Sequence, residues 1–138
     1  MDKPTYKIFI ARADDINSNN RLYPLVEIQK AVEEYNSRGH QFMWVDNMKD
    51  TIDLNKIVGV VLKLYLEGND LYADVQPTET PMKATVWNDD GMIPGVHVRF
   101  VGFGNVHEEG NFGRVLDFRI NHLNAHGPAE AVAWGEIG

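Results

Sequence analysis

The chain has 138 residues, a length that suits one domain with a sizeable core and is too short for two. Hydrophobic residues make up 43% and charged residues 24% of the sequence, as in soluble globular proteins, so intrinsic disorder is not expected. Thirteen Lys and Arg stand against 20 Asp and Glu, and neither half of the chain supplies the basic face that nucleic-acid phosphates require.

Features that the sequence lacks exclude further classes of protein. No apolar run approaches the length of a membrane span, and the first residues lack the order of a secretory signal, so we expect a soluble protein made in the cytoplasm, with no membrane partner. The sequence has no cysteine, which excludes disulfides, thiolate metal sites and cysteine nucleophiles. A serine nucleophile would have to be Ser18 or Ser37, since the chain has no other serine.

The first third of the chain predicts a strand, a loop and a helix. Residues 5–13 are β-branched and aromatic, which favours a strand with one buried side, and the polar residues 14–21 favour a loop. Pro24 is placed for a helix start and Gly39 for a helix end. Between them the apolar residues have helical spacing and should cover a sheet, while four charged residues face water: Glu27, Lys30, Glu33 and Glu34.

The remaining chain predicts mainly strands separated by polar turns. The expected strands are residues 41–45, 57–66, 71–75, 95–106 and 113–121, with a four-residue hairpin connection at 67–70 and polar turns at 46–50, 88–91 and 107–111. Residues 77–81 form a break, residues 83–87 a short helix, and residues 129–134 one or two helical turns. The sum is an α+β fold in a single domain, residues 1–138, with a mainly antiparallel sheet or partly closed β-barrel and one packed helix.

Three polar patterns are typical of turns or strands rather than of bound ions. Residues 15–19 alternate oxygen-bearing side chains as a calcium loop does, but Asn20 and Val26 stand where that loop needs glycine and glutamate. Residues 102–107 begin like a phosphate-binding loop inside a strand pattern. The histidines His107, His122 and His126 are interpreted as solvated turn residues, so we expect no metal and no other cofactor.

His97 is the histidine that stands out for acid–base chemistry. It lies in a predicted strand between apolar neighbours, Val96 and Val98. The sequence favours the alternative that it is a partly buried strand histidine hydrogen-bonded to a neighbour.

One segment resembles a known family. Residues 15–24, from Asp15 to Pro24, followed by a helix through Asn36, resemble the N-terminal motif of the prohead core protein proteases of tailed phages. These are serine proteases that mature the capsid, with a fold similar to that of the herpesvirus assemblins. Later segments resemble the family in the same order: residues 51–59, Thr80 and Pro81, His97 to Gly104, and Pro128. The resemblance covers most of the chain and implies a prohead-protease-like fold.

The chain departs from the family at both catalytic positions. The family's nucleophilic serine stands two residues before an arginine, and here His97 precedes Arg99 in that arrangement. Asn47 stands at the nearest match to the family's catalytic histidine. An imidazole does not readily replace the serine alkoxide, and an asparagine cannot accept its proton, so the resemblance implies a protease fold that has lost its enzyme activity.

These expectations favour a structural protein of the phage head, located in the virion. It would be a capsid decoration or minor capsid protein that binds the major capsid protein and further copies of itself. The candidate contact residues lie in the resembling loop: Asn17, Asn20, Arg21 and Tyr23.

Two alternatives stay open. The first is an active prohead maturation protease of the serine type, or one that uses His97, His122 and a carboxylate unusually. The second is a prohead core assembly factor that is lost before maturation.

Overall fold

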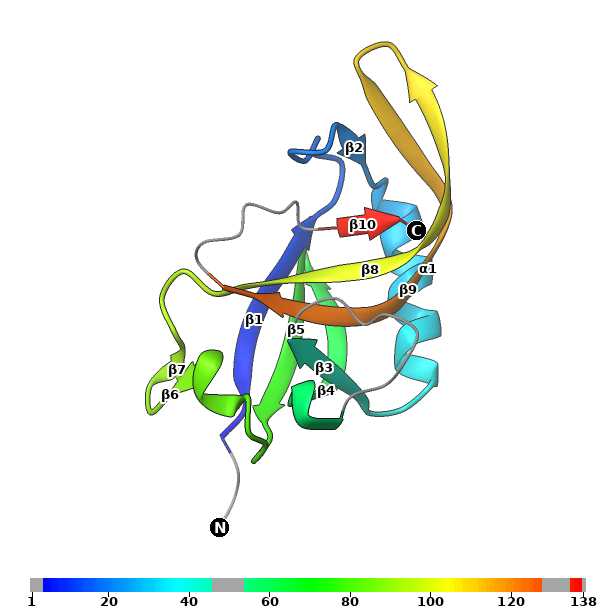
Figure 1. Ribbon diagram of the computed structural model, residues 1–138. Coiled ribbons are helices and arrows are strands. Elements are labelled where there is room, and N and C mark those ends of the chain that lie inside the picture. The colour runs from blue at the N-terminus through cyan, green and yellow to red at the C-terminus, as the bar shows by residue number, and fades with distance from the viewer. Residues whose placement is uncertain (1–3, 46–53, 128–134, 138) are drawn as a thin grey trace.

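The computed structural model describes residues 4–45, 54–127 and 135–137, which form mostly β-structure with a single α-helix (Figure 1). Two short 3₁₀ turns occupy Leu54–Lys56 and Lys83–Thr85, the second where a short helix was predicted. The helix is α1 (Leu25–Ser37), and the strands are β1 (Tyr6–Arg12), β2 (Arg21–Leu22), β3 (Gln41–Val45), β4 (Ile57–Glu67), β5 (Asp70–Pro77), β6 (Trp87–Asn88), β7 (Gly91–Met92), β8 (His97–Glu109), β9 (Phe112–His126) and β10 (Gly135–Ile137).

The main sheet curls into a half-barrel in the order β1-β5-β4-β3-β9-β8-β10, with β2 beside β9 (Figure 1). The prediction of a mainly antiparallel sheet is only partly right, because β2 and β3 run parallel to β9, and β10 runs parallel to β8. Such pairs need long connections, whereas a local pattern of alternating residues shows a strand but not the direction of its neighbour. β6 and β7 form a separate small hairpin.

The predicted helix is confirmed from Leu25 to Ser37. Pro24 precedes it in an extended conformation, and Gly39 follows it with φ of +79°, a backbone conformation that favours glycine. Glu27, however, does not face water. Its side chain is buried, and Oε2 accepts a hydrogen bond from the backbone N–H of Asp117 at 3.1 Å, because α1 lies against β9 where that strand bends.

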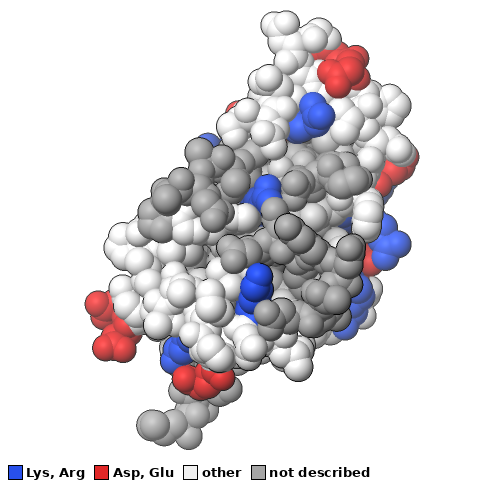
Figure 2. All heavy atoms as spheres, in the orientation of Figure 1, with Lys and Arg blue, Asp and Glu red and all other residues white. Residues whose placement is uncertain are grey.

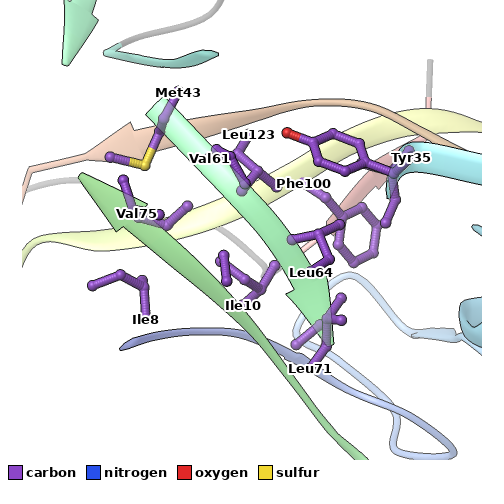
Figure 3. Packing of buried hydrophobic residues seen from close by; sticks show 14 of the residues in the cluster. Ile8, Ile10, Tyr35, Met43, Val61, Leu64, Leu71, Val75, Phe100 and Leu123 are labelled. Atoms are coloured by element: carbon purple, nitrogen blue, oxygen red, sulfur yellow. The ribbon is translucent and has the colours of Figure 1, made fainter. Parts of the chain in front are cut away.

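The hydrophobic core fills the space between the curled sheet and α1 (Figure 3). Strands β1, β3, β4, β5, β8 and β9 all contribute to it, and burial of each large apolar side chain stabilises the fold by about 1.5–3 kcal/mol. The largest fully buried side chains are Tyr23, Tyr35, Phe100, Ile10, Ile28, Met43, Leu64, Leu71, Ile120, Leu123, Val58 and Val61.

β8 and β9 are longer than predicted and form an arm that extends beyond the rest of the sheet (Figure 1). Residues 107–109, predicted as a turn, continue β8, and the connection is only Gly110 and Asn111. The sequence does not predict this extension of the strand, because both faces of the arm are exposed to water near its tip and no alternation of apolar and polar residues marks a strand there. Near the tip Arg114 donates from Nε to both carboxylate oxygens of Glu109 at 3.0 Å, and this hydrogen bonding lowers the pKa of Glu109.

The β4–β5 hairpin also has a tighter connection than predicted. Glu67 pairs with Asp70, so the loop contains two residues, Gly68 and Asn69, instead of four. The predicted helical turns at 129–134 and the polar turn at 46–50 lie outside the described residues.

Tyr35 provides a test of the core. Its side chain is 1% exposed, and among the described residues its hydroxyl has no hydrogen-bond partner. We expect Tyr35→Phe to raise the free energy of unfolding by about 1 kcal/mol at neutral pH, because it removes a buried hydroxyl that lacks a partner. Urea denaturation measures this change, and destabilisation of similar size would contradict it.

The same substitution should change the response to alkali. Burial raises the pKa of Tyr35 well above its ordinary value of 10.0. The unfolded chain therefore releases this proton first, and the stability contributed by the neutral phenol is present below about pH 10 and is lost as the pH rises further. Tyr35→Phe should flatten this loss. Tyr65→Phe is the comparison. Burial and the hydrogen bond that the Tyr65 hydroxyl donates to Asp74 at 3.0 Å raise the pKa of Tyr65 as well, but its site is partly exposed, so this substitution should flatten the loss less than Tyr35→Phe does.

Candidate functional site

Four polar side chains gather where the start of β8 meets the end of β9. In the antiparallel register His97 lies opposite His126, and Arg99 lies opposite Asn124. Arg99, Asn124 and His126 are buried, and His97 is half-buried. Burying polar groups is costly unless they are paired, so this polar cluster, His97, Arg99, Asn124 and His126, is the candidate functional site.

The two imidazoles and the guanidinium contact one another directly. The rings of His97 and His126 stack with centroids 5.8 Å apart and an interplanar angle of 25°. The Nε of Arg99 donates to Nε2 of His126 at 2.9 Å. Because Nε2 accepts this bond, a neutral His126 carries its hydrogen on Nδ1. The half-buried strand histidine predicted at position 97 is observed, but its neighbour is a stacked ring.

β3 brings a third strand to the polar cluster. It runs parallel to β9, with Trp44 beside Asn124 and Val45 beside Ala125. The described end of β3 therefore lies at the same end of the sheet as His126. Asn47, the position expected for the family's histidine, lies outside the described residues.

No serine lies at the polar cluster. Ser18 is exposed in the loop before β2, and Ser37 is exposed at the end of α1, where its Oγ donates to the backbone oxygen of Glu34 at 2.6 Å. Within residues 4–45, 54–127 and 135–137, no hydroxyl is hydrogen-bonded to a histidine. The imidazoles and guanidinium can bind and orient a polar group, but they do not supply the alkoxide of an acyl-enzyme mechanism.

The loop that carries the predicted contact residues is stabilised by its own hydrogen bonds. Asn17 is 4% exposed, and its Oδ1 accepts hydrogen bonds from the backbone N–H groups of Asn19 at 2.9 Å and Arg21 at 3.0 Å. Tyr23 is fully buried, Arg21 is half-buried and Asn20 is exposed with φ of +58°. Asn17 and Tyr23 therefore shape the loop, and a capsid or self contact through it stays a prediction.

The remaining histidines do not come together in the described part of the chain. No group of three metal-ligating side chains is found there. His122 lies on β9 beside Asn121 rather than in a turn, and His107 lies near the exposed tip of the arm. His126, predicted as a solvated turn residue, is instead a buried end of β9.

Sequence reasoning singled out His97 but missed Arg99, Asn124 and His126 as its neighbours. His126 and Asn124 precede Gly127 and Pro128, a setting typical of loops, and their pairing with β8 depends on a register shift within the strands. One feature of the sequence could have indicated these neighbours: the arginine two residues after His97. A charged side chain in a buried strand is rarely without a partner, so Arg99 predicts polar groups beside it.

On the face drawn in Figure 2, the described residues carry both acidic and basic side chains. No helix among the described residues is long and apolar enough to cross a membrane.

Comparison with known proteins identifies the fold. No model of a protein family matches the chain, and no curated protein is found to be similar to it. Among solved structures, the chain is similar to the capsid assembly protease of bacteriophage T4, with a TM-score of 0.72 and 23% sequence identity over 88% of this chain and 80% of that chain. The expected prohead-protease-like fold is therefore confirmed.

Proposed function

We propose that this chain is a phage head-assembly protein that uses a protease-like fold to bind other head proteins without cutting them. The observation that carries the proposal is the polar cluster, in which strand β8 presents His97 two residues before Arg99 and no serine is near. The likeness to a capsid assembly protease supports the phage-head setting.

The binding role has two specific forms. A capsid decoration or minor capsid protein would remain in the virion beside the major capsid protein. The charge of the second half of the chain supports an outer position, because residues 70–138 carry ten acidic and four basic side chains and would be repelled by packaged DNA. A prohead core assembly factor would instead leave before maturation.

An active maturation protease is the second candidate, and the name of the T4 neighbour favours it. A serine-type enzyme would have to use Ser18 or Ser37, which lie away from the polar cluster. The other form of this alternative uses His97, His122 and a carboxylate, and in the structure the imidazole that stacks on His97 is that of His126.

Incubation of the purified chain with capsid and core precursors of its phage distinguishes binding from cutting. We expect co-sedimentation with a precursor and no cleavage products by mass spectrometry, because neither serine lies at the polar cluster. Ser18→Ala and Ser37→Ala serve as matched controls and should behave as the wild type. Cleavage that is lost in His97→Ala would overturn the proposal in favour of the protease.

The copy number in purified, DNA-filled heads then separates the two forms of the binding role. We expect a simple ratio to the major capsid protein by quantitative mass spectrometry. Presence in proheads together with absence from mature heads would refute decoration and establish the core assembly factor.

A further inference from the structure

The half-barrel leaves a seam between its first strand and β8. β1 pairs with β5 on one side and ends the sheet on the other, yet it packs near β8 without a ladder of hydrogen bonds between them in the described part of the chain. A pocket of about 410 Å³ lies at this seam. It is lined by Tyr6, Lys7, Ile8, Phe9, Asp90, Gly91, Met92, Val96 and His97.

The register shows which peptide groups of β1 face away from the sheet. The two residues that flank a two-residue hairpin loop form both backbone hydrogen bonds with each other, so the peptide groups of Asp70 bond to β4. The peptide groups of successive strand residues point to opposite sides, so every second residue of β5 after Asp70 has its backbone N–H and C=O directed toward β1. By this alternation Ala73 and Val75 bond to Ile8 and Tyr6, their partners in the register. The backbone N–H and C=O groups of Lys7 and Phe9 then point outward, along the free edge.

The free edge is not covered by its own side chains. Lys7 places its ammonium 2.7 Å from Glu67 and over the Tyr72 ring, and the Phe9 ring also packs against Tyr72, so both side chains lie on the outer face of the sheet. Among the described residues no other group is hydrogen-bonded to the outward peptide groups of Lys7 and Phe9.

The far wall of the pocket is held in place by aromatic packing. Tyr6 stacks on Trp87 of β6 with ring centroids 5.4 Å apart, and Trp87 Nε1 donates to the backbone oxygen of Val58 at 2.7 Å. This anchors the β6–β7 hairpin, which carries Met92, against the start of β1. The pocket therefore exists before any ligand binds, which lowers the entropy cost of binding.

His97 links the pocket to the polar cluster. It lines the pocket, and its Nε2 is a buried atom with no hydrogen-bond partner among the described residues. A buried imidazole nitrogen without a partner is costly, and a ligand that offers a hydrogen-bonding group would relieve that cost.

We propose that the free edge of β1 and this pocket bind an extended segment of a partner polypeptide by strand addition. The peptide groups of Lys7 and Phe9 recur every second residue, a spacing that matches another polypeptide backbone. One apolar side chain of the segment enters the pocket beside Met92 and Val96, and one peptide group lies within reach of His97. The inference rests on the proposed function, since it names the kind of partner that the binding protein takes.

A single strand fits this edge better than a second copy of the chain does. The edge of β1 is faced by a wall made of the β6–β7 hairpin and the start of β8. Two copies that paired through β1 would have to bring two such walled edges together, whereas an extended segment is one strand wide.

Selection from a displayed library of random peptides of about ten residues tests the proposal with the full chain as bait. We expect enriched peptides with alternating apolar residues. Their affinity, measured by fluorescence anisotropy, should fall about tenfold or more for Lys7→Pro and Phe9→Pro, because proline removes an outward N–H without touching the ladder to β5. Lys7→Ala and Phe9→Ala keep that N–H and should bind nearly as the wild type does.

Two outcomes would overturn the inference. One is the absence of any enriched peptide, or equal binding by the proline and alanine variants when circular dichroism shows all of them folded. The other is wild-type self-association in sedimentation that Phe9→Pro abolishes, which would make a second copy the occupant. Neither outcome tests whether the chain cleaves head precursors. Cleavage of the bound peptides would contradict the proposed function, but it would not contradict the strand-addition site.

Discussion

Phe100→Ala is expected to lower the free energy of unfolding by about 4 kcal/mol, a large part of the total stability of a domain of this size. Phe100 is fully buried at the centre of an aromatic group. Its ring meets Tyr23 edge-on with centroids 5.0 Å apart and lies 4.9 Å from the ring of Phe118. Truncation removes these contacts and leaves a cavity that the surrounding strands cannot fill.

Urea denaturation followed by tryptophan fluorescence measures the change. Phe103→Ala is the matched control, since Phe103 lies on the same strand with its side chain 58% exposed, and its loss should cost less than about 0.5 kcal/mol. A cost for Phe100→Ala as small as that of the control would show that the aromatic group does not carry the packing of this region.

The position of Phe100 gives the substitution a second consequence. Tyr23 ends the loop that resembles the phage proteases, and its ring rests on both Phe100 and Phe118. The truncated variant should therefore loosen the loop of residues 14–23 before the whole domain unfolds. Faster amide hydrogen exchange in that loop than in β4 and β5 would show this local effect.

Gly102→Ala is expected to destabilise the protein by about 3 kcal/mol or more, through a clash rather than a cavity. A Cβ at this position would lie 2.0 Å from the backbone oxygen of Arg119 and 3.1 Å from the ring of Phe118. The register of β8 and β9 shifts between Val101 and Gly102, which brings the opposite backbone this close. Backbone cannot rotate away as a flexible side chain can, so the two strands must separate.

Thermal unfolding of Gly102→Ala is compared with that of Gly127→Ala, the matched control. A Cβ at Gly127 would meet nothing within 4 Å, so that substitution should change stability by less than about 0.5 kcal/mol. If the two alanine variants unfold at the same temperature, the close approach of β8 and β9 is not maintained in solution.

Local sequence patterns predict single helices and strands of this protein, but they do not predict the site around His97. Helix α1 was predictable because Pro24, Gly39 and the apolar spacing between them act within one segment. β1, β3, β4 and β5 were predictable for the same reason, since strand-forming residues alternate or cluster within each of them. The absence of cysteine and the position of both serines were also visible without a structure.

Contacts between distant segments could not be read in the same way. Glu27 has the spacing of a solvated helix residue, and only the bend of β9 brings the Asp117 N–H to its carboxylate. The parallel pairing of β3 with β9 joins residues about eighty positions apart, and the stacking of His97 on His126 depends on a register set by bulges. Side-chain identity limits which local structures form, but burial, strand direction and register arise when all segments share one core, and the open seam beside β1 exists only in that assembled sheet.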